Sequence, residues 1–278
     1  MKKLLEIFKN NWKQISLSYL LYFISVVLLA FYPKILGDTI DHLVDGDYGY
    51  IWALVIVFLG FIVFGYISNI YDTIVFSSAY RKVASKEINS QIDRGIDSSK
   101  INGRLSLMHS LITFFENNVT RIINIIVTLT ISIYFIMIID GWLVLWLIGS
   151  GILMLLVSYY FSPKIQLVTK KLNDVVEEQT HIVTSLNIKW INNLLRRRQK
   201  LMISQSNIYA NFGGAVQIIS YSLITCMLIY YVTNYDVTIG SVFSTYRYMF
   251  DFCNAVIMMT TIVPEIINIK DVIRRLDE

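Results

Sequence analysis

Long apolar runs constrain this chain more than any other feature of its sequence. Six runs of about 20 residues follow one another, a length that spans the hydrocarbon core of a bilayer when the run is helical. Four of them contain no charged side chain: Gln14–Tyr32, Tyr50–Tyr71, Gly141–Pro163 and Phe212–Val232. Charged residues make up only 16% of the chain, against about a quarter in soluble domains. We therefore predict an all-α membrane protein with transmembrane helices over residues 14–36, 50–71, 119–139, 141–163, 212–232 and 239–264.

The basic residues predict the orientation of these spans. Of the 24 Lys and Arg residues, 22 lie at the N-terminus, in the long stretches 72–118 and 164–211, at Arg121 or after residue 264. Because Lys and Arg near span ends favour the cytoplasmic side, both termini and both long stretches are predicted to be cytoplasmic. We expect the membrane to be the bacterial cytoplasmic (inner) membrane.

The stretches between the spans also have helical patterns. Residues 1–14 combine basic and apolar positions at helical spacing, which is typical of a helix that lies in the membrane interface. The stretches 72–118 and 164–211 carry apolar residues at helical spacing and are not rich in glycine or proline. If each forms two helical legs of about 20 residues, each leg reaches about 30 Å. We therefore predict two long cytoplasmic helical hairpins.

Several short segments resemble those of a known family. They are Tyr32–Asp41 (YPKILGDTID), Gly103–Leu105 followed by Phe114–Glu116, Thr238–Val242 and Ile273–Leu276. In order and spacing they are similar to the six-helix transmembrane domain of the ABC exporters, with residues 1–14 as the interfacial elbow helix, and the match covers essentially all 278 residues. The resemblance implies one transmembrane domain over residues 1–278. It also implies a dimer, expected to be domain-swapped, with twelve helices around a cavity that opens to alternate sides.

The resemblance also implies partners. Short coupling helices at the hairpin tips, about Asp97–Arg104 and Asn192–Lys200, would touch an ATPase domain. The residues expected there are Asp97, Lys100, Arg104, Asn193, Arg196 and Arg197. The sequence contains no GxxxxGK[ST] phosphate loop and ends where the family's nucleotide-binding domain would begin. We therefore expect no enzymatic activity and no cofactor in this chain, with ATP bound by a separate subunit if transport is ATP-driven.

The span predicted over residues 239–264 differs from the others because it carries Arg247 and Asp251 near its middle. Residues four apart share one helix face and can pair. The cost of an ionisable side chain at mid-membrane is about 2.5–3.5 kcal/mol on insertion scales, so the two charges need a reason. The same face continues as a polar line: Ser244, Arg247, Asp251, Asn254, Met258, Thr261 and Glu265.

Two interpretations of this polar line remain open. We favour the wall of a water-filled substrate cavity, with Asp251 or Glu265 as the acceptor of a proton or cation. The alternative is a structural ion pair that fixes helix packing. Tyr246 and Tyr248 flank Arg247 and are the aromatic residues that we expect to contact substrate.

A second polar stripe lies on the span predicted over residues 119–139. It contains Asn117, Arg121, Asn124, Thr128 and Ser132, with Glu116 at its start. The secondary site candidates are Glu116, Arg121 and Asn124 of this stripe and Asp72, which lies just past the span predicted over residues 50–71. Because Asn and Thr side chains hydrogen-bond between membrane helices, we interpret this stripe mainly as packing. The basic run Arg196–Arg198 is interpreted as cytoplasmic charge and not as a nucleic-acid site. The isolated histidines indicate no metal site.

Three functions are compatible with these features. The leading hypothesis is the transmembrane subunit of an ABC-type transporter, a homodimer or a heterodimer with a similar subunit, served by a separate ATPase. The first alternative is a proton- or ion-coupled secondary transporter on the same fold, which works without ATP. The second alternative is a membrane scaffold or regulator that transports nothing. Membrane lipid is an expected partner in all three cases.

Overall fold

The computed structural model describes residues 11–92, 98–184 and 188–277, and within them the chain folds into six long helices. They are α2 (Trp12–Val44), α3 (Ile51–Ile92), α4 (Ser98–Ile139), α5 (Gly141–Thr184), α6 (Ile188–Asn234) and α7 (Ile239–Asp277). The all-α prediction is confirmed for this part of the chain. The interfacial helix predicted over residues 1–14 lies mostly outside it, and Trp12 already belongs to α2.

Five of these helices, α2 to α6, are long and apolar enough to cross a membrane. Helix α7 is not among them, because Arg247, Asp251 and several hydroxyl and amide side chains lower its mean hydropathy. The predicted span over residues 239–264 is helical, but its place in the membrane stays a prediction.

The helices extend well beyond the predicted spans. Helices α3 and α4 have 42 residues each, or about 63 Å at 1.5 Å per residue, twice the hydrocarbon thickness of about 30 Å. The two long stretches are therefore helical legs, as predicted, with α3 and α4 connected through residues 93–97. Helices α5 and α6 are connected through residues 185–187.

Two predicted boundaries are wrong. The first transmembrane helix was predicted over residues 14–36, but α2 continues through Pro33 and Gly37 to Val44. Within this extension Asp38 forms a salt bridge with Lys34, one helical turn earlier, whose Nζ lies 2.5 Å from the Asp38 carboxylate. The second correction concerns the expected coupling segment Asn192–Lys200, which lies inside α6 and not at the hairpin link. Its basic run marks an exposed helix face, and such a face can lie anywhere along a helix.

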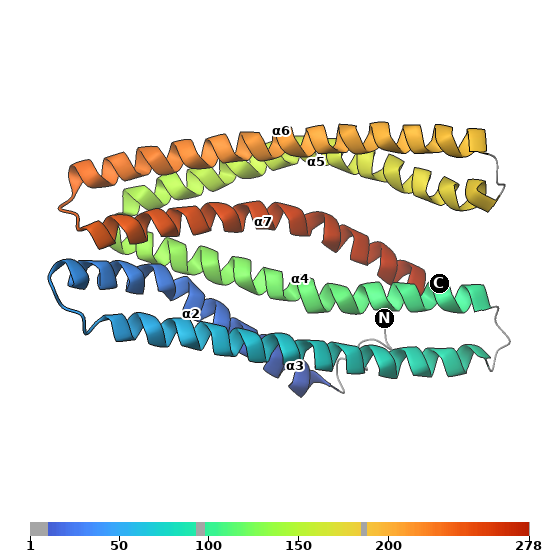
Figure 1. The fold of residues 1–278 in the computed structure, drawn as a ribbon, viewed down its shortest axis with the longest axis horizontal. Helices are drawn as coiled ribbons and strands as arrows, with labels where there is room; N and C mark the ends of the chain where they lie inside the picture. The colour runs from blue at the N-terminus through green and yellow to red at the C-terminus, as the bar shows by residue number, and fades with distance from the viewer. Residues whose placement is uncertain (1–10, 93–97, 185–187, 278) are drawn as a thin grey trace. The chain divides into compact units, whose positions relative to one another are not determined.

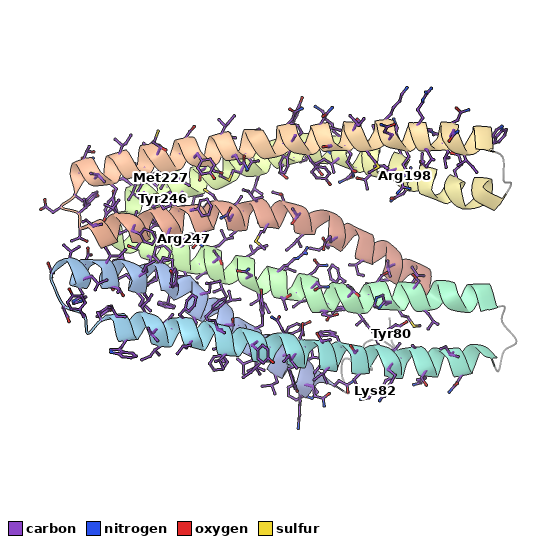
Figure 2. All side chains as sticks on the ribbon, viewed as in Figure 1. Tyr80, Lys82, Arg198, Met227, Tyr246 and Arg247 are labelled. Atoms are coloured by element: carbon purple, nitrogen blue, oxygen red, sulfur yellow. The ribbon has the colours of Figure 1, made fainter. Side chains whose placement is uncertain are left out.

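The chain forms two compact units, and the first contains residues 1–144 and 228–278. Within it, α2 packs against α3 and α7, and α4 packs against α7, α2 and α3 (Figure 1). A buried cluster joins α2, α3 and α4: Ile15, Val75, Phe76, Val83, Met108 and Ile112. Beside it, Tyr80 of α3 packs edge-on against His109 of α4 at 5.2 Å (Figure 2).

The second unit, residues 145–227, is a hairpin of α5 and α6. Contacts between the two helices run antiparallel: Met154 with Ser220, Phe161 with Phe212, Thr169 with Gln205 and Glu178 with Arg197. Each step forward on α5 is matched by an equal step backward on α6. The two legs therefore stay in register from the membrane-spanning part to the link.

Candidate functional site

Arg247 and Asp251 form a two-point salt bridge on α7. The Arg247 Nε donates to Asp251 Oδ2 at 3.1 Å, and Nη2 lies 3.1 Å from Oδ1. The two side chains are 43% and 21% exposed, so the pair is only partly covered by protein. Figure 2 shows Arg247 on α7 next to Tyr246. The spacing of four residues predicted this pairing, and the structure has it.

The pair lines a cavity of about 170 Å³ between α2, α4 and α7, all within the first unit. Helix α2 contributes Val26, Leu29, Ala30, Tyr32 and Pro33; α4 contributes Asn124, Ile125, Thr128 and Ser132; α7 contributes Arg247, Tyr248, Asp251, Asn254, Ala255 and Met258. Arg247 and Asp251 therefore have the geometry that both interpretations expect, the structural ion pair and the cavity wall. The charges are paired, and they also face a cavity.

Part of the polar stripe of α4, namely Asn124, Thr128 and Ser132, faces the same cavity. Thr128 Oγ1 donates to Asn124 Oδ1 at 3.1 Å, and Ser132, which is 1% exposed, lies one turn further along. The residue types of this stripe favoured a role mainly in helix packing. The structure instead places it across the cavity from α7, because α4 and α7 pack side by side along their lengths.

The wall formed by α2 was missed from the sequence. Its residues belong to an uncharged apolar run, which predicts a membrane span and nothing more. The available signal was Pro33, which directly follows that run and lies inside the span predicted over residues 14–36. Proline has no N–H, so the carbonyl of Leu29, four residues earlier, has no helical hydrogen bond from it. Both residues line the cavity.

Of the tyrosines expected to contact substrate, only one reaches the cavity. Tyr248 is 2% exposed, lines the cavity and stacks on Phe135 of α4 with ring centroids 4.7 Å apart. Tyr246 stacks on Phe250 and is not a lining residue. Ser244 is buried and donates to the carbonyl of Ser241, and it is not a lining residue either.

Arg121 and Glu265 form a separate pair between α4 and α7. The Arg121 Nη1 lies 3.2 Å from Glu265 Oε1, and the side chains are 47% and 38% exposed. Neither residue lines the cavity. Glu265 was predicted to belong to the same cavity as Asp251, but the structure places it with Arg121 beyond the cavity along α7.

The other secondary candidates, Asp72 and Glu116, lie where α2, α3 and α4 meet. Ser18 Oγ donates to Asp72 Oδ1 at 2.7 Å, and Tyr19 Oη donates to the carbonyl of Phe115 at 3.0 Å. These contacts connect three helices through polar groups. Within the described part of the chain, no group of three His, Cys, Asp or Glu side chains is placed to hold a metal ion.

The candidates for partner contact lie on α4 and α6. Asn193, Arg196 and Arg197 are exposed on α6. A hollow of about 190 Å³ is lined by Glu178, Trp190, Asn193, Leu194 and Arg197, and the Arg197 Nη1 lies 3.1 Å from Glu178 Oε2. Lys100 and Arg104 belong to the first turns of α4, and Asp97 lies outside the described residues.

Comparison with known protein families gives a match to the ABC transporter transmembrane region over residues 4–240. The chain belongs to this family. It is therefore an integral membrane protein and a component of a membrane transporter. The family match includes the α2 and α4 walls of the cavity and ends at the first turn of α7, before Arg247 and Asp251. A search of curated protein sequences found no match.

Proposed function

We propose that this chain is the transmembrane subunit of an ABC-type transporter. It moves a solute across the cytoplasmic membrane by alternating access, and a separate subunit supplies ATP hydrolysis. Family membership supports the transporter assignment. The observation that carries the proposal is the polar cavity between α2, α4 and α7.

The cavity supports transport because its charges would be costly in a purely structural helix. Insertion scales assign about 2.5–3.5 kcal/mol to an ionisable group at mid-membrane. Arg247 and Asp251 limit that cost by pairing, but Arg247 remains 43% exposed. A water-filled cavity that opens to one side of the membrane and then to the other gives both charges a solvated environment. We propose the same cavity as the substrate site.

The exposed face of α6 that carries the basic run is the proposed ATPase contact. It presents the basic side chains Arg196 and Arg197, and Trp190 beside them is 62% exposed. A large exposed aromatic residue among charges is a common feature of protein interfaces. We further propose that two such subunits, identical or similar, form one transport pathway and that both compact units belong to one transmembrane domain.

Affinity purification of the tagged chain from its native membrane tests this function. An ATPase is expected to co-purify and to hydrolyse ATP after reconstitution into nanodiscs. Reversal of charge at Arg196 and Arg197 together is expected to release the ATPase. Lys170→Glu is the matched control because Lys170 is also exposed on the same hairpin. If the chain purifies intact without any ATPase, the ATP-driven function is wrong.

A secondary transporter on the same fold is the second candidate. The observation that favours it is the carboxylate of Asp251, which lines the cavity and can exchange a proton with a solvated interior. In liposomes that contain the chain alone and no ATP, this function predicts solute uptake driven by a pH gradient. Asp251→Asn would abolish the coupling. Uptake that is indifferent to the gradient, or unaffected by Asp251→Asn, contradicts it.

A further inference from the structure

We propose that the cavity binds a small zwitterion, a molecule with an ammonium and a carboxylate group beside an apolar side chain of about the size of leucine. This inference rests on the proposed function because it takes the cavity between α2, α4 and α7 as the substrate site. It is carried by the charge arrangement, the free hydrogen-bonding groups and the shape of that cavity.

The charge arrangement selects against ligands with a net charge. Arg247 and Asp251 present opposite charges side by side, with nitrogen–oxygen distances of 3.1 Å. A ligand with only a carboxylate would be attracted by the guanidinium and repelled by the neighbouring Asp251. A ligand with only an ammonium would be attracted by Asp251 and repelled by the neighbouring guanidinium of Arg247. A zwitterion placed antiparallel to the pair brings each of its charges next to an opposite one, so both Coulomb terms are favourable.

The pair retains the hydrogen-bonding groups that such a ligand needs. A guanidinium has five N–H donors, and the salt bridge uses one on Nε and one on Nη2. The other donors have no hydrogen bond to any described residue. Each carboxylate oxygen of Asp251 accepts from Arg247 and keeps a second lone pair. Arg247 can therefore bind a ligand carboxylate while Asp251 accepts from a ligand ammonium.

Further acceptors belong to residues that line the cavity. The Leu29 carbonyl lacks its helical donor because Pro33 has no N–H. Asn254 lines the cavity from α7, and Asn124 does so from α4. An ammonium has three N–H donors, which a single carboxylate leaves partly unsatisfied. The cavity therefore has more than one acceptor available to it.

The remaining surface and the volume fit a compact apolar side chain. Val26, Leu29 and Ala30 of α2 form an apolar wall, to which Ile125 and Met258 contribute from α4 and α7. The cavity volume of about 170 Å³ is close to that of an engineered cavity of about 150 Å³ that binds benzene. Benzene has six non-hydrogen atoms and the side chain of leucine has four, so the apolar part of the cavity has room for that side chain while the ligand's charged groups lie at the Arg247–Asp251 pair.

Three probes with the same side chain test the proposal on the purified full chain in nanodiscs. They are L-leucine, N-acetyl-L-leucine, which keeps only the carboxylate, and L-leucine methyl ester, which keeps only the ammonium. Calorimetry is expected to give an affinity for L-leucine on the order of tenfold higher than for either derivative, the value of one charge-assisted hydrogen bond. Equal binding of all three, or binding of none, overturns the proposal.

Charge-neutral variants make the test specific. In Asp251→Asn the guanidinium is no longer opposed, so the preference should shift to N-acetyl-L-leucine. In Arg247→Gln it should shift to the methyl ester. A shift in preference cannot result from loss of folding, which lowers all three affinities together. Lys34→Gln and Asp38→Asn are matched controls, because that pair has the same spacing on α2 and lies outside the cavity lining.

The outcome is independent of the ATPase, since binding is measured on the chain alone. If L-leucine binds with this selectivity but no ATPase co-purifies, the ATP-driven function is wrong and the inference holds. If an ATPase co-purifies while the three probes bind equally or not at all, only the zwitterion inference is wrong.

Discussion

Gly37 of α2 and Gly240 of α7 lie in direct backbone contact, although about 200 residues separate them in the chain. A Cβ placed on Gly37 would lie 2.5 Å from the carbonyl oxygen of Gly240 and 3.0 Å from the Cβ of Ser244. A Cβ on Gly240 would lie still closer to the Gly37 carbonyl. Two helices can approach this closely only where both residues lack side chains. This contact fixes the start of α7 against α2, at one end of the cavity.

Alanine at either glycine is expected to destabilise the protein. Because the nearest atoms belong to the backbone, the helices must move apart, and overpacking of this kind typically costs about 1–3 kcal/mol. Thermal unfolding of Gly37→Ala and Gly240→Ala in detergent measures the loss. Gly213→Ala is the control, since no atom lies within 4 Å of its added Cβ. There the better helix propensity of alanine should stabilise by about 0.5–1 kcal/mol, and equal effects at all three sites would contradict the close contact.

Asp41 caps α7 from α2. Its Oδ1 accepts from the N–H of Gly240 at 2.7 Å, and its Oδ2 accepts from Thr238 Oγ1 at 2.5 Å. Thr238 and Ser241 complete the cap, each accepting with its hydroxyl oxygen from the N–H of the other. The first turn of α7 therefore depends on a carboxylate of another helix.

Removal of this carboxylate should loosen the first turn of α7. Asp41→Ala is expected to cost about 1 kcal/mol, as lost N-caps do, and Asp41→Asn less, because the amide oxygen can still accept from Gly240. Hydrogen exchange of the amides at 240–242 measures the local effect. Asp38→Asn is the control: its pair with Lys34 is partly exposed and contributes little. Unchanged exchange in Asp41→Ala would show that the cap is not needed.

The sequence predicted the features that depend on neighbouring residues. Apolar runs and helical spacing are local properties, and they correctly indicated the long helices and the pairing of Arg247 with Asp251. The end of α2 was placed wrongly because it depends on distant residues. Asp41 has its hydrogen-bonding partners in α7, and nothing in the nearby sequence indicates them.

The cavity could likewise be predicted only in part, because it depends on contacts between residues that are far apart in the sequence. The polar faces of α4 and α7 were each recognisable by spacing, but whether they face each other depends on how the two helices pack. The α2 wall was missed, since Val26 and Ala30 look like any lipid-facing positions and only Pro33 near them is unusual in a helix. Glu265 was grouped with Asp251 because it continues the same helix face. A face of α7 that extends from residue 244 to 265 is longer than the cavity, so its far end meets Arg121 instead.

The Arg121–Glu265 pair is expected to contribute little to stability. Both side chains are more than one-third exposed, and exposed pairs contribute about 0–1 kcal/mol. A double-mutant cycle with Arg121→Gln and Glu265→Gln measures the coupling by chemical unfolding. The exchanged pair Arg121→Glu with Glu265→Arg should recover most of the loss seen in Arg121→Glu alone. A coupling of several kcal/mol would mean that the pair is far less hydrated than its exposure indicates.

A hydrogen-bonded carboxylate at the start of α5 gives a pH-dependent contribution. The N–H of Trp142 donates to Asp140 at 3.0 Å, and together with the hydroxyl of Tyr235 it lowers the pKa of Asp140 below its ordinary value. The same hydrogen bond raises the pKa of Tyr235 to about 12. A carboxyl group whose pKa is lowered on folding stabilises the fold at pH values above its ordinary pKa of about 4. This stabilisation is lost as the pH falls through the pKa of the folded state. A phenol whose pKa is raised on folding stabilises the fold at pH values below its ordinary pKa of about 10. This stabilisation is lost as the pH rises toward 12.

The difference in melting temperature between the wild type and Tyr235→Phe should therefore be constant between about pH 5 and pH 9 and decrease on both sides. Asp140→Asn should remove the acid limb, because an amide does not titrate. Asp236→Asn, which changes the next exposed residue, is the control and should follow the wild-type curve. A Tyr235→Phe difference that does not change at high pH would show that the phenol of Tyr235 does not donate to Asp140.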